Sequence, residues 1–331
     1  MISRLTSSRF PLGIAAEYPS VAATIDSPAR MAEAVIKAAG LRMSYGELEA
    51  VRGIDLQVDA GEIFAFLGPN GAGKTTTVEI FEGYRRRTGG EVEVLGVDPQ
   101  HATRAWRQRV GFVLQECRLT PELTVREAVE QYAGYYEAPR DVQQTIGLVG
   151  LDEKADARTS TLSGGQQRRL DVALALIGDP ELLFLDEPTT GFDPSARRQA
   201  WDVIGSMRDL GKTVFLTTHY MDEAQVLADR AAIIVAGEIV AEGDPAQLGS
   251  DGGPEAVISF RLPKGTSPTE LPPPFADAAK RGEAVVSHAS DDPLADLRTL
   301  IDWAQARGTG LPSLEVRRPS LEDAYLELTS R

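Results

Sequence analysis

The chain has 331 residues, of which 42% are hydrophobic, and its single cysteine, Cys117, excludes an intramolecular disulfide and suits a reducing cytoplasm. The formal net charge of −15 argues against a nucleic-acid partner, because proteins that bind phosphate backbones usually present a basic face. No apolar run approaches the ~20 residues that a membrane-spanning helix needs, so the chain itself is not expected to cross a bilayer.

Residues 1–34 open the chain without a patterned apolar face. They are rich in serine, alanine and proline, and they contain no apolar run long enough for a signal peptide. We expect this segment to be a disordered extension. Because Met31 opens the stretch that leads into strand-like sequence, we also hypothesise that residues 1–30 reflect a start codon assigned too early.

Residues 35–248 alternate short apolar runs with amphipathic stretches, which is typical of an α/β domain with a mostly parallel sheet. Continuous apolar runs at 63–67, 182–185 and 214–216 have the length and composition of buried strands. Residues 232–240 predict a hairpin that turns at Gly237 and Glu238.

A phosphate loop follows the first of these strands. The sequence Gly-Pro-Asn-Gly-Ala-Gly-Lys-Thr fits G-x-x-x-x-G-K-[ST] between a strand and a helix, the context that the motif requires. Its glycines let backbone N–H groups wrap phosphate oxygens, and the helix adds its positive end. Lys74 is expected to reach the β- and γ-phosphates of ATP, and the Thr75 hydroxyl to coordinate Mg²⁺. The predicted nucleotide-binding residues here are Gly68, Pro69, Asn70, Gly71, Ala72, Gly73, Lys74, Thr75 and Thr76.

Two carboxylates end the apolar run at 182–185. Ligands of open α/β sheets bind at the carboxyl ends of strands, which is where Asp186 and Glu187 fall. Asp186 is placed to hold Mg²⁺ through its water shell. Glu187 is the candidate general base, which would polarise a water for attack on the γ-phosphate.

The sequence Leu-Ser-Gly-Gly-Gln at 162–166 completes a set of motifs in which the chain resembles the ABC ATPases over about residues 35–248. The resemblance implies an α/β fold, with a P-loop NTPase core of ABC-ATPase type and with antiparallel β and helical subdomains. It implies that Tyr45 stacks on adenine, that Gln115 contacts Mg²⁺ and water, and that His219 bonds the γ-phosphate. With Lys74 and Glu187, these last two complete the family's catalytic set, so the chain is expected to hydrolyse ATP.

The same resemblance implies a dimer, because ATP in this family lies between the phosphate loop of one cassette and the signature of another. One cassette per chain predicts a head-to-tail pair, most simply a homodimer. Phe192 stands where many members carry leucine, and we expect altered packing with activity retained. The signature and D-loop residues expected to contact nucleotide across the interface are Ser163, Gly164, Gly165, Gln166 and Asp193.

Residues 249–331 predict a small accessory α+β domain after a flexible linker at 249–254. A strand is expected at 257–262, and Ser320 with Asp323 forms a capping box before a final helix. The residues expected on the buried face of the intervening helix are Leu294, Leu297, Leu300, Ile301 and Ala304.

Three machines remain possible at this point: the motor of an exporter, a soluble ABC ATPase that acts on nucleic acid or ribosomes, and an importer cassette. The 74–163 interval leaves no room for the long coiled coil of chromosome-organising members. Translation-factor members carry two cassettes in one chain, whereas this chain has one. DNA-repair members of the excision type carry zinc-binding cysteines, whereas this chain has a single cysteine. The tail at 251–331 and the segment 217–224 resemble bacterial drug-resistance exporter ATPases of the daunorubicin type. The favoured function is therefore efflux of a drug-like or lipid-like substrate through a separate integral-membrane permease, from the cytoplasmic face of a bacterial membrane, although the motifs alone do not distinguish export from import.

Overall fold

The computed structural model describes residues 33–113, 120–248, 256–279, 284–317, 321, 322 and 325. Within this part of the chain, no helix combines the length and the apolar character needed to span a bilayer. The predictions that fall wholly or largely outside the described residues concern the extension at 1–34, Gln115, Cys117, the linker at 249–254 and the capping box of Ser320 and Asp323.

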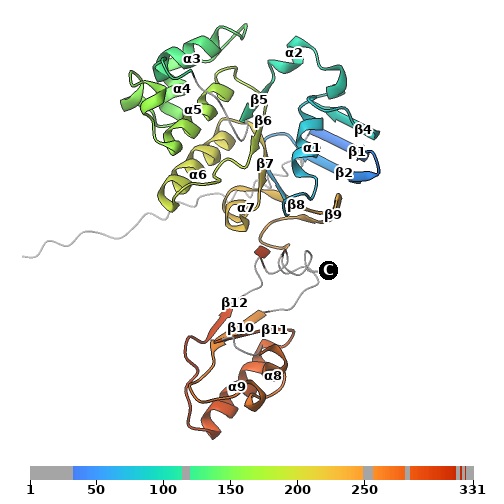
Figure 1. Ribbon diagram of the computed structural model, residues 1–331, viewed down its shortest axis with the longest axis vertical. Coiled ribbons are helices and arrows are strands. Elements are labelled where there is room, and N and C mark those ends of the chain that lie inside the picture. Colours follow the sequence, from blue (N-terminus) through green and yellow to red (C-terminus); the bar gives the residue numbers. More distant parts are fainter. Residues whose placement is uncertain are drawn as a thin grey trace, which may run out of the picture. The chain divides into compact units, whose positions relative to one another are not determined.

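A six-stranded sheet in the order β5-β6-β7-β3-β8-β9 organises the first and larger part of the fold (Figure 1). Its strands are parallel except β9, which forms an antiparallel hairpin with β8. The predicted strands and hairpin are confirmed, although the hairpin turns at Ala236 and Gly237, one residue earlier than expected. The bounds are β3 Ile63–Leu67, β5 Val110–Val113, β6 Leu182–Asp186, β7 Thr213–Thr218, β8 Arg230–Val235 and β9 Glu238–Gly243.

Both faces of this sheet are covered, which explains why its central strands are continuously apolar. Successive side chains of a strand point to opposite faces. Phe64, Phe184 and Phe215 enter one core, which also contains the apolar residues of α1 (Lys74–Phe81). The neighbouring residues on these strands, such as Ile63, Leu183 and Val214, enter a second core that α5 (Gly164–Leu176) and α6 (Pro194–Asp209) complete.

A three-stranded antiparallel sheet in the order β2-β1-β4 contributes to the first of these cores. Ile36 and Val94, which pair across β1 and β4, are both fully buried there. The bounds are β1 Ala34–Tyr45, β2 Leu48–Asp59, β4 Gly89–Val94, and the short helix α2 Arg104–Arg107 lies between β4 and β5 in the chain.

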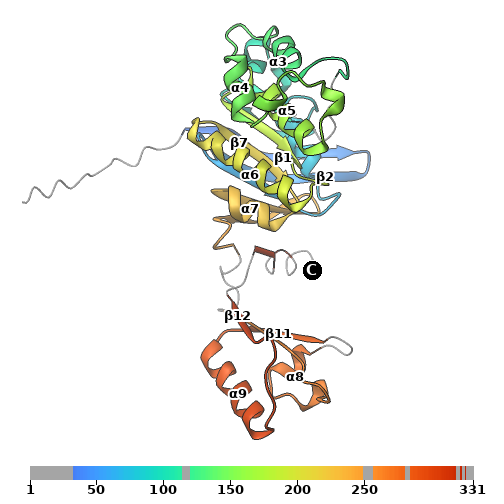
Figure 2. The ribbon, with the colours of Figure 1, turned by 90° about the vertical axis from the view of Figure 1, so that its left-hand side faces the viewer.

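Helices α3, α4 and α5 contact one another and group together in both views (Figures 1 and 2). The long helix α5 begins directly after Ser163, because Ser163 and Gln166 form a reciprocal capping box that satisfies its first N–H groups. The bounds are α3 Val125–Ala133, α4 Val142–Leu148 and α5 Gly164–Leu176. Two further helices follow β6 and β7 in the chain, α6 Pro194–Asp209 and α7 Met221–Leu227.

The C-terminal part contains an antiparallel sheet in the order β11-β10-β12 with its own apolar cluster. The predicted face of α9 is only partly right. Leu300 and Ala304 are buried, whereas Leu294 is 81% exposed and Ile301 is 40% exposed. Trp303 packs against the cluster instead, since the sheet covers one side of a helix that has apolar residues on two. The bounds are β10 Ala256–Arg261, α8 Phe275–Ala278, β11 Val285–Ser290, α9 Pro293–Ala306 and β12 Glu315–Arg317.

Candidate active site

The phosphate loop connects β3 to α1, and two of its glycines are required by close backbone approaches. A Cβ on Gly68 would lie 2.4 Å from the carbonyl oxygen of Ile234. Gly73, which precedes α1, has φ +106°, and a Cβ there would lie 2.5 Å from the carbonyl oxygen of Ala50. No other residue type fits either position without moving the backbone, so the loop's path depends on both glycines.

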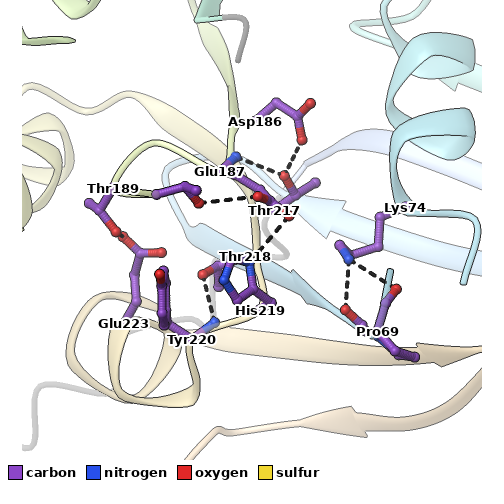
Figure 3. A network of polar contacts seen from close by, with 12 residues as sticks. Pro69, Lys74, Asp186, Glu187, Thr189, Thr217, Thr218, His219, Tyr220 and Glu223 are labelled. Carbon is purple, nitrogen blue, oxygen red and sulfur yellow. Dashed lines mark hydrogen bonds and ion pairs between the residues drawn. The ribbon is translucent and has the colours of Figure 1, made fainter. Parts of the chain in front are cut away.

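Lys74 opens α1 and lies back over the loop (Figure 3). Its Nζ donates to the carbonyl oxygens of Gly68, at 2.6 Å, and Pro69, at 3.2 Å. Burial lowers the pKa of Lys74, while Glu187 and Asp186 act in the opposite direction. The ammonium group is therefore held within the loop by two carbonyls and faces the two carboxylates predicted for the site.

The strand order brings the other predicted residues to the same edge. Because β7 lies between β3 and β6, the carboxyl ends of these three parallel strands meet. They carry the phosphate loop, the pair Asp186 and Glu187, and the segment from Thr217 to His219 (Figure 3). Residues far apart in the sequence thus form one cluster at the edge where α/β sheets bind ligands.

Thr217 of β7 anchors both carboxylate residues. Its Oγ1 donates to Oδ1 of Asp186 at 2.5 Å and accepts the backbone N–H of Glu187 at 3.1 Å. The backbone carbonyl of Asp186 accepts a bond of 2.8 Å from the Arg168 guanidinium. Sequence reasoning missed both partners, because neither a threonine inside a strand nor an arginine inside a helix stands out by pattern.

Glu187 adopts a backbone conformation that is unusual for a non-glycine residue, with φ 45°. Such strained positions concentrate at functional sites. Its Oε2 accepts a bond of 3.1 Å from the Thr190 hydroxyl, and its Oε1 lies 3.3 Å from Nδ1 of His219. The structure therefore brings the predicted base next to His219, the residue expected to bond the γ-phosphate.

Ser163 and Asp193 both line a pocket of about 210 Å³. Each caps a helix: Asp193 accepts N–H bonds from Ser195 and Ala196 at the start of α6, as Ser163 caps α5. Two helix N-termini thus converge there, which favours an anionic ligand. Residues lining the pocket include Ser163, Gly165, Gln166, Arg169, Asp193 and Ser195, and none of them belongs to the phosphate loop.

Tyr45 ends β1 and is 41% exposed. The guanidinium of Arg85 lies 5.2 Å from the centroid of the Tyr45 ring. The Tyr45 hydroxyl lies 3.4 Å from the Thr76 hydroxyl of α1. An exposed aromatic ring held next to the phosphate loop can stack on a nucleotide base. The position of Gln115, the remaining predicted catalytic residue, falls outside the described part of the chain.

Glu82, directly after α1, is a further acid that sequence reasoning missed. Burial, followed by the nearby charges of Asp186 and Glu79, raises the pKa of Glu82 to about 8. A carboxyl whose pKa is raised on folding keeps its proton in the native state after the unfolded chain has lost it. The free energy of unfolding therefore falls as the pH rises from about 4.5 to about 8 and levels off above that range.

Replacing Glu82 by glutamine removes this penalty. In the absence of nucleotide, we expect the Glu82→Gln variant to have a Tm at least about 4 °C above that of wild type at pH 8. Near pH 4.5 the two Tm values should be equal. Roughly 1 kcal/mol shifts Tm by about 2–4 °C in domains of 150–250 residues. Thermal unfolding of the variant and of Glu47→Gln, an exposed control in the β1–β2 turn, measures the difference. Equal Tm gains at both pH values would contradict the assigned pKa.

Comparison with known proteins gives a consistent result. A family profile described as "ABC transporter" matches residues 51–190, and a second, described as "ABC transporter domain-containing protein-like, C-terminal domain", matches residues 256–320. The Nod factor export ATP-binding protein I of Rhizobium meliloti strain 1021 is 40% identical over 305 residues, covering 89% of this chain and 88% of the relative. The protein of the same name from Paraburkholderia xenovorans is 38% identical, covering 91% and 99%.

Solved structures of similar fold cover about two thirds of the chain. The cbiO1 protein of Clostridium perfringens, part of the ABC transporter complex cbiONQ, is 27% identical with a TM-score of 0.60, covering 64% of this chain and 89% of that one. A dimeric ATP-binding cassette in a post-hydrolysis state, bound to ADP and Pi, is 26% identical with a TM-score of 0.57, covering 63% and 98%.

Proposed function

The chain belongs to the ABC transporter family and is an ATPase of that family, and from this premise we propose that it powers export through a separate integral-membrane permease. The observation that carries the proposal is that relatives named for export align with about nine tenths of the chain, the C-terminal segment included. The cargo is drug-like or lipid-like, as the sequence resemblance implies. The subunit then works at the cytoplasmic face of a bacterial membrane.

Five residues share the binding and the hydrolysis of ATP. Lys74, already buried in the loop, binds the β- and γ-phosphates and supplies a positive charge where negative charge develops. Glu187 accepts a proton from the attacking water as the bond between the γ-phosphorus and the bridging oxygen of ADP breaks. His219, 3.3 Å from Glu187, bonds the γ-phosphate and holds that water. Tyr45 stacks on adenine, and Gln115 contacts the water.

Mg²⁺ fits the donor set at this site. The described residues include no group of three or more His, Cys, Asp or Glu side chains placed to hold a metal. Mg²⁺ needs no such cage, because it usually keeps several waters and binds one or two carboxylates together with substrate phosphates. The Thr75 hydroxyl and the Asp186 carboxylate, with Gln115, would hold it, and it would neutralise charge on the phosphates. Thr217, which donates to Asp186, fixes the direction of that carboxylate.

The pocket of Ser163 and Asp193 supports a head-to-tail homodimer. It combines two helix N-termini with Arg169, the elements of an anion site, yet no residue of its own chain's phosphate loop lines it. In the proposed dimer this pocket, with Gly164, Gly165 and Gln166, covers the γ-phosphate bound by the partner. A solved relative of 26% identity is itself described as dimeric with ADP and Pi.

Capture of the partner tests the exporter proposal. Tagged protein carrying Glu187→Gln is purified from detergent-solubilised native cells with Mg-ATP, next to tagged wild type with EDTA, and bound proteins are identified by mass spectrometry. We expect enrichment of a multi-spanning membrane protein in the first sample, together with loss of efflux of a drug-like or lipid-like compound when its gene is deleted. Enrichment of ribosomal or DNA-bound proteins would overturn the proposal, and loss of uptake on deletion would instead identify an importer.

A further inference from the structure

Glu223 of α7 is a fully buried acid that joins three segments of the site, and Figure 3 shows its contact with Thr189. Its Oε1 accepts a bond of 2.9 Å from the hydroxyl of Thr189, which follows the catalytic strand β6 by three residues. The same oxygen accepts a bond of 3.0 Å from Nε1 of Trp201 on α6. A buried acid is costly unless it is hydrogen-bonded, so these two donors fix where α7 lies relative to α6 and to the segment after Glu187.

Arg197 makes a second link between α6 and the same region. Its guanidinium lies 4.1 Å from the ring centroid of Tyr220 and its Nη1 lies 3.5 Å from Oδ2 of Asp222. The Tyr220 ring in turn contacts the imidazole of His219, with 4.1 Å between ring centroids. A single ring, that of Tyr220, therefore lies between the guanidinium and the imidazole of His219.

Both links come from one face of α6. Arg197 and Trp201 are four residues apart, which places them next to each other on the helix surface. The helix begins directly after Asp193, whose side chain caps it and lines the pocket assigned above to the dimer interface. We propose that Arg197 and Trp201 are positioning residues, which brace the segment from His219 to Glu223 so that α6 sets the place of the imidazole next to Glu187.

The brace has a functional consequence that rests on the proposed dimer mechanism. A helix that caps the interface pocket at one end and holds the His219 segment one to two turns later connects the two places physically. Closure of the partner onto Asp193 would then change the position of the His219 imidazole. The predicted effect of losing the brace is a lower rate of hydrolysis with ATP binding retained, because neither Arg197 nor Trp201 belongs to the phosphate loop.

Histidine NMR tests the positioning directly, without any activity. The chain has three histidines, so a protein labelled with ¹³C-histidine shows three imidazole signals, and the His219→Gln variant assigns the relevant one. We expect Arg197→Met and Trp201→Phe each to shift the His219 signal and to leave those of His101 and His288 in place. Trp201→Phe keeps the aromatic ring and removes only the donor to Glu223. Arg198→Met, the exposed neighbour on α6, is the matched control and is expected to shift none.

Steady-state kinetics give the second readout. In the two brace variants we expect kcat for ATP hydrolysis to fall by about tenfold with KM within about twofold of wild type, since roughly 1 Å of misplacement can cost about 10²-fold. Arg198→Met is expected to match wild type. A His219 signal that is unchanged in both folded variants would overturn the brace. Capture of ribosomal or DNA-bound proteins in the pull-down described above would instead overturn the proposed function, and the NMR comparison would still decide the positioning claim.

Discussion

The Glu187→Gln variant is expected to hydrolyse ATP about 10²- to 10⁴-fold more slowly than wild type, the range that a general base contributes. Glutamine has nearly the same shape as glutamate. We therefore expect the bond from the residue 187 backbone N–H to the Thr217 hydroxyl, and the contact with His219, to be retained. What is lost is the capacity to accept a proton from the attacking water. ATP binding is expected to be retained, and the protein to accumulate as an ATP-bound dimer.

Phosphate release at saturating Mg-ATP measures the rate, and light scattering measures the dimer. The matched control is Glu238→Gln, the same substitution at an exposed position of the β8–β9 hairpin, which should retain wild-type turnover and return to monomer as ATP is consumed. A Glu187→Gln protein with more than about a tenth of wild-type activity would show that another group acts as the base. A slow variant that stays monomeric in saturating Mg-ATP would count against the dimer.

The Lys74→Met variant is expected to weaken ATP binding by about 10- to 100-fold. Charge-assisted bonds are worth roughly 1.5–3 kcal/mol each, and methionine keeps most of the stem but removes the ammonium group. Without nucleotide, the variant should be at least as stable as wild type. Burial lowers the pKa of Lys74, which means that the charged form is disfavoured in the folded protein.

Two thermal measurements separate these effects. A bound ligand raises stability by RT ln(1 + [L]/Kd), so Mg-ATP should raise the Tm of wild type strongly and that of Lys74→Met little at the same concentration. Lys154→Met, at an exposed position after α4, is the control and should respond to Mg-ATP as wild type does. If Lys74→Met gained as much Tm from Mg-ATP as wild type, the ammonium would not be a phosphate ligand.

Much of the site was predictable because its signals are local. The phosphate loop requires glycines at fixed positions between a strand and a helix, and Gly68 and Gly73 show why: a side chain at either meets backbone within 2.5 Å. The cap of α5 is equally local, since Ser163 and Gln166 bond each other's backbone three residues apart. Patterns of this kind depend on the geometry of a few consecutive residues, which the chain carries wherever it folds.

Other features escaped prediction because they depend on distant neighbours. Glu223 in Met-Asp-Glu-Ala has the composition of an exposed helix start, yet it is fully buried because Thr189 and Trp201 supply donors from other elements. On α9, the apolar pattern alone does not determine which side the sheet covers, so the sequence predicts Leu294 on the buried face whereas it is exposed.

The sequence by itself determined the buried parallel strands, the phosphate loop, the acidic pair at the end of β6 and the family to which these motifs belong. Only the tertiary structure decided that β7 lies between β3 and β6, and therefore that His219 comes to lie 3.3 Å from Glu187 and that Thr217 bonds Asp186. The physical reason is the range of the interactions. Glycine conformations, caps and periodic burial act over a few residues, whereas strand order and buried polar partners depend on hydrogen bonds between segments that are far apart in the chain.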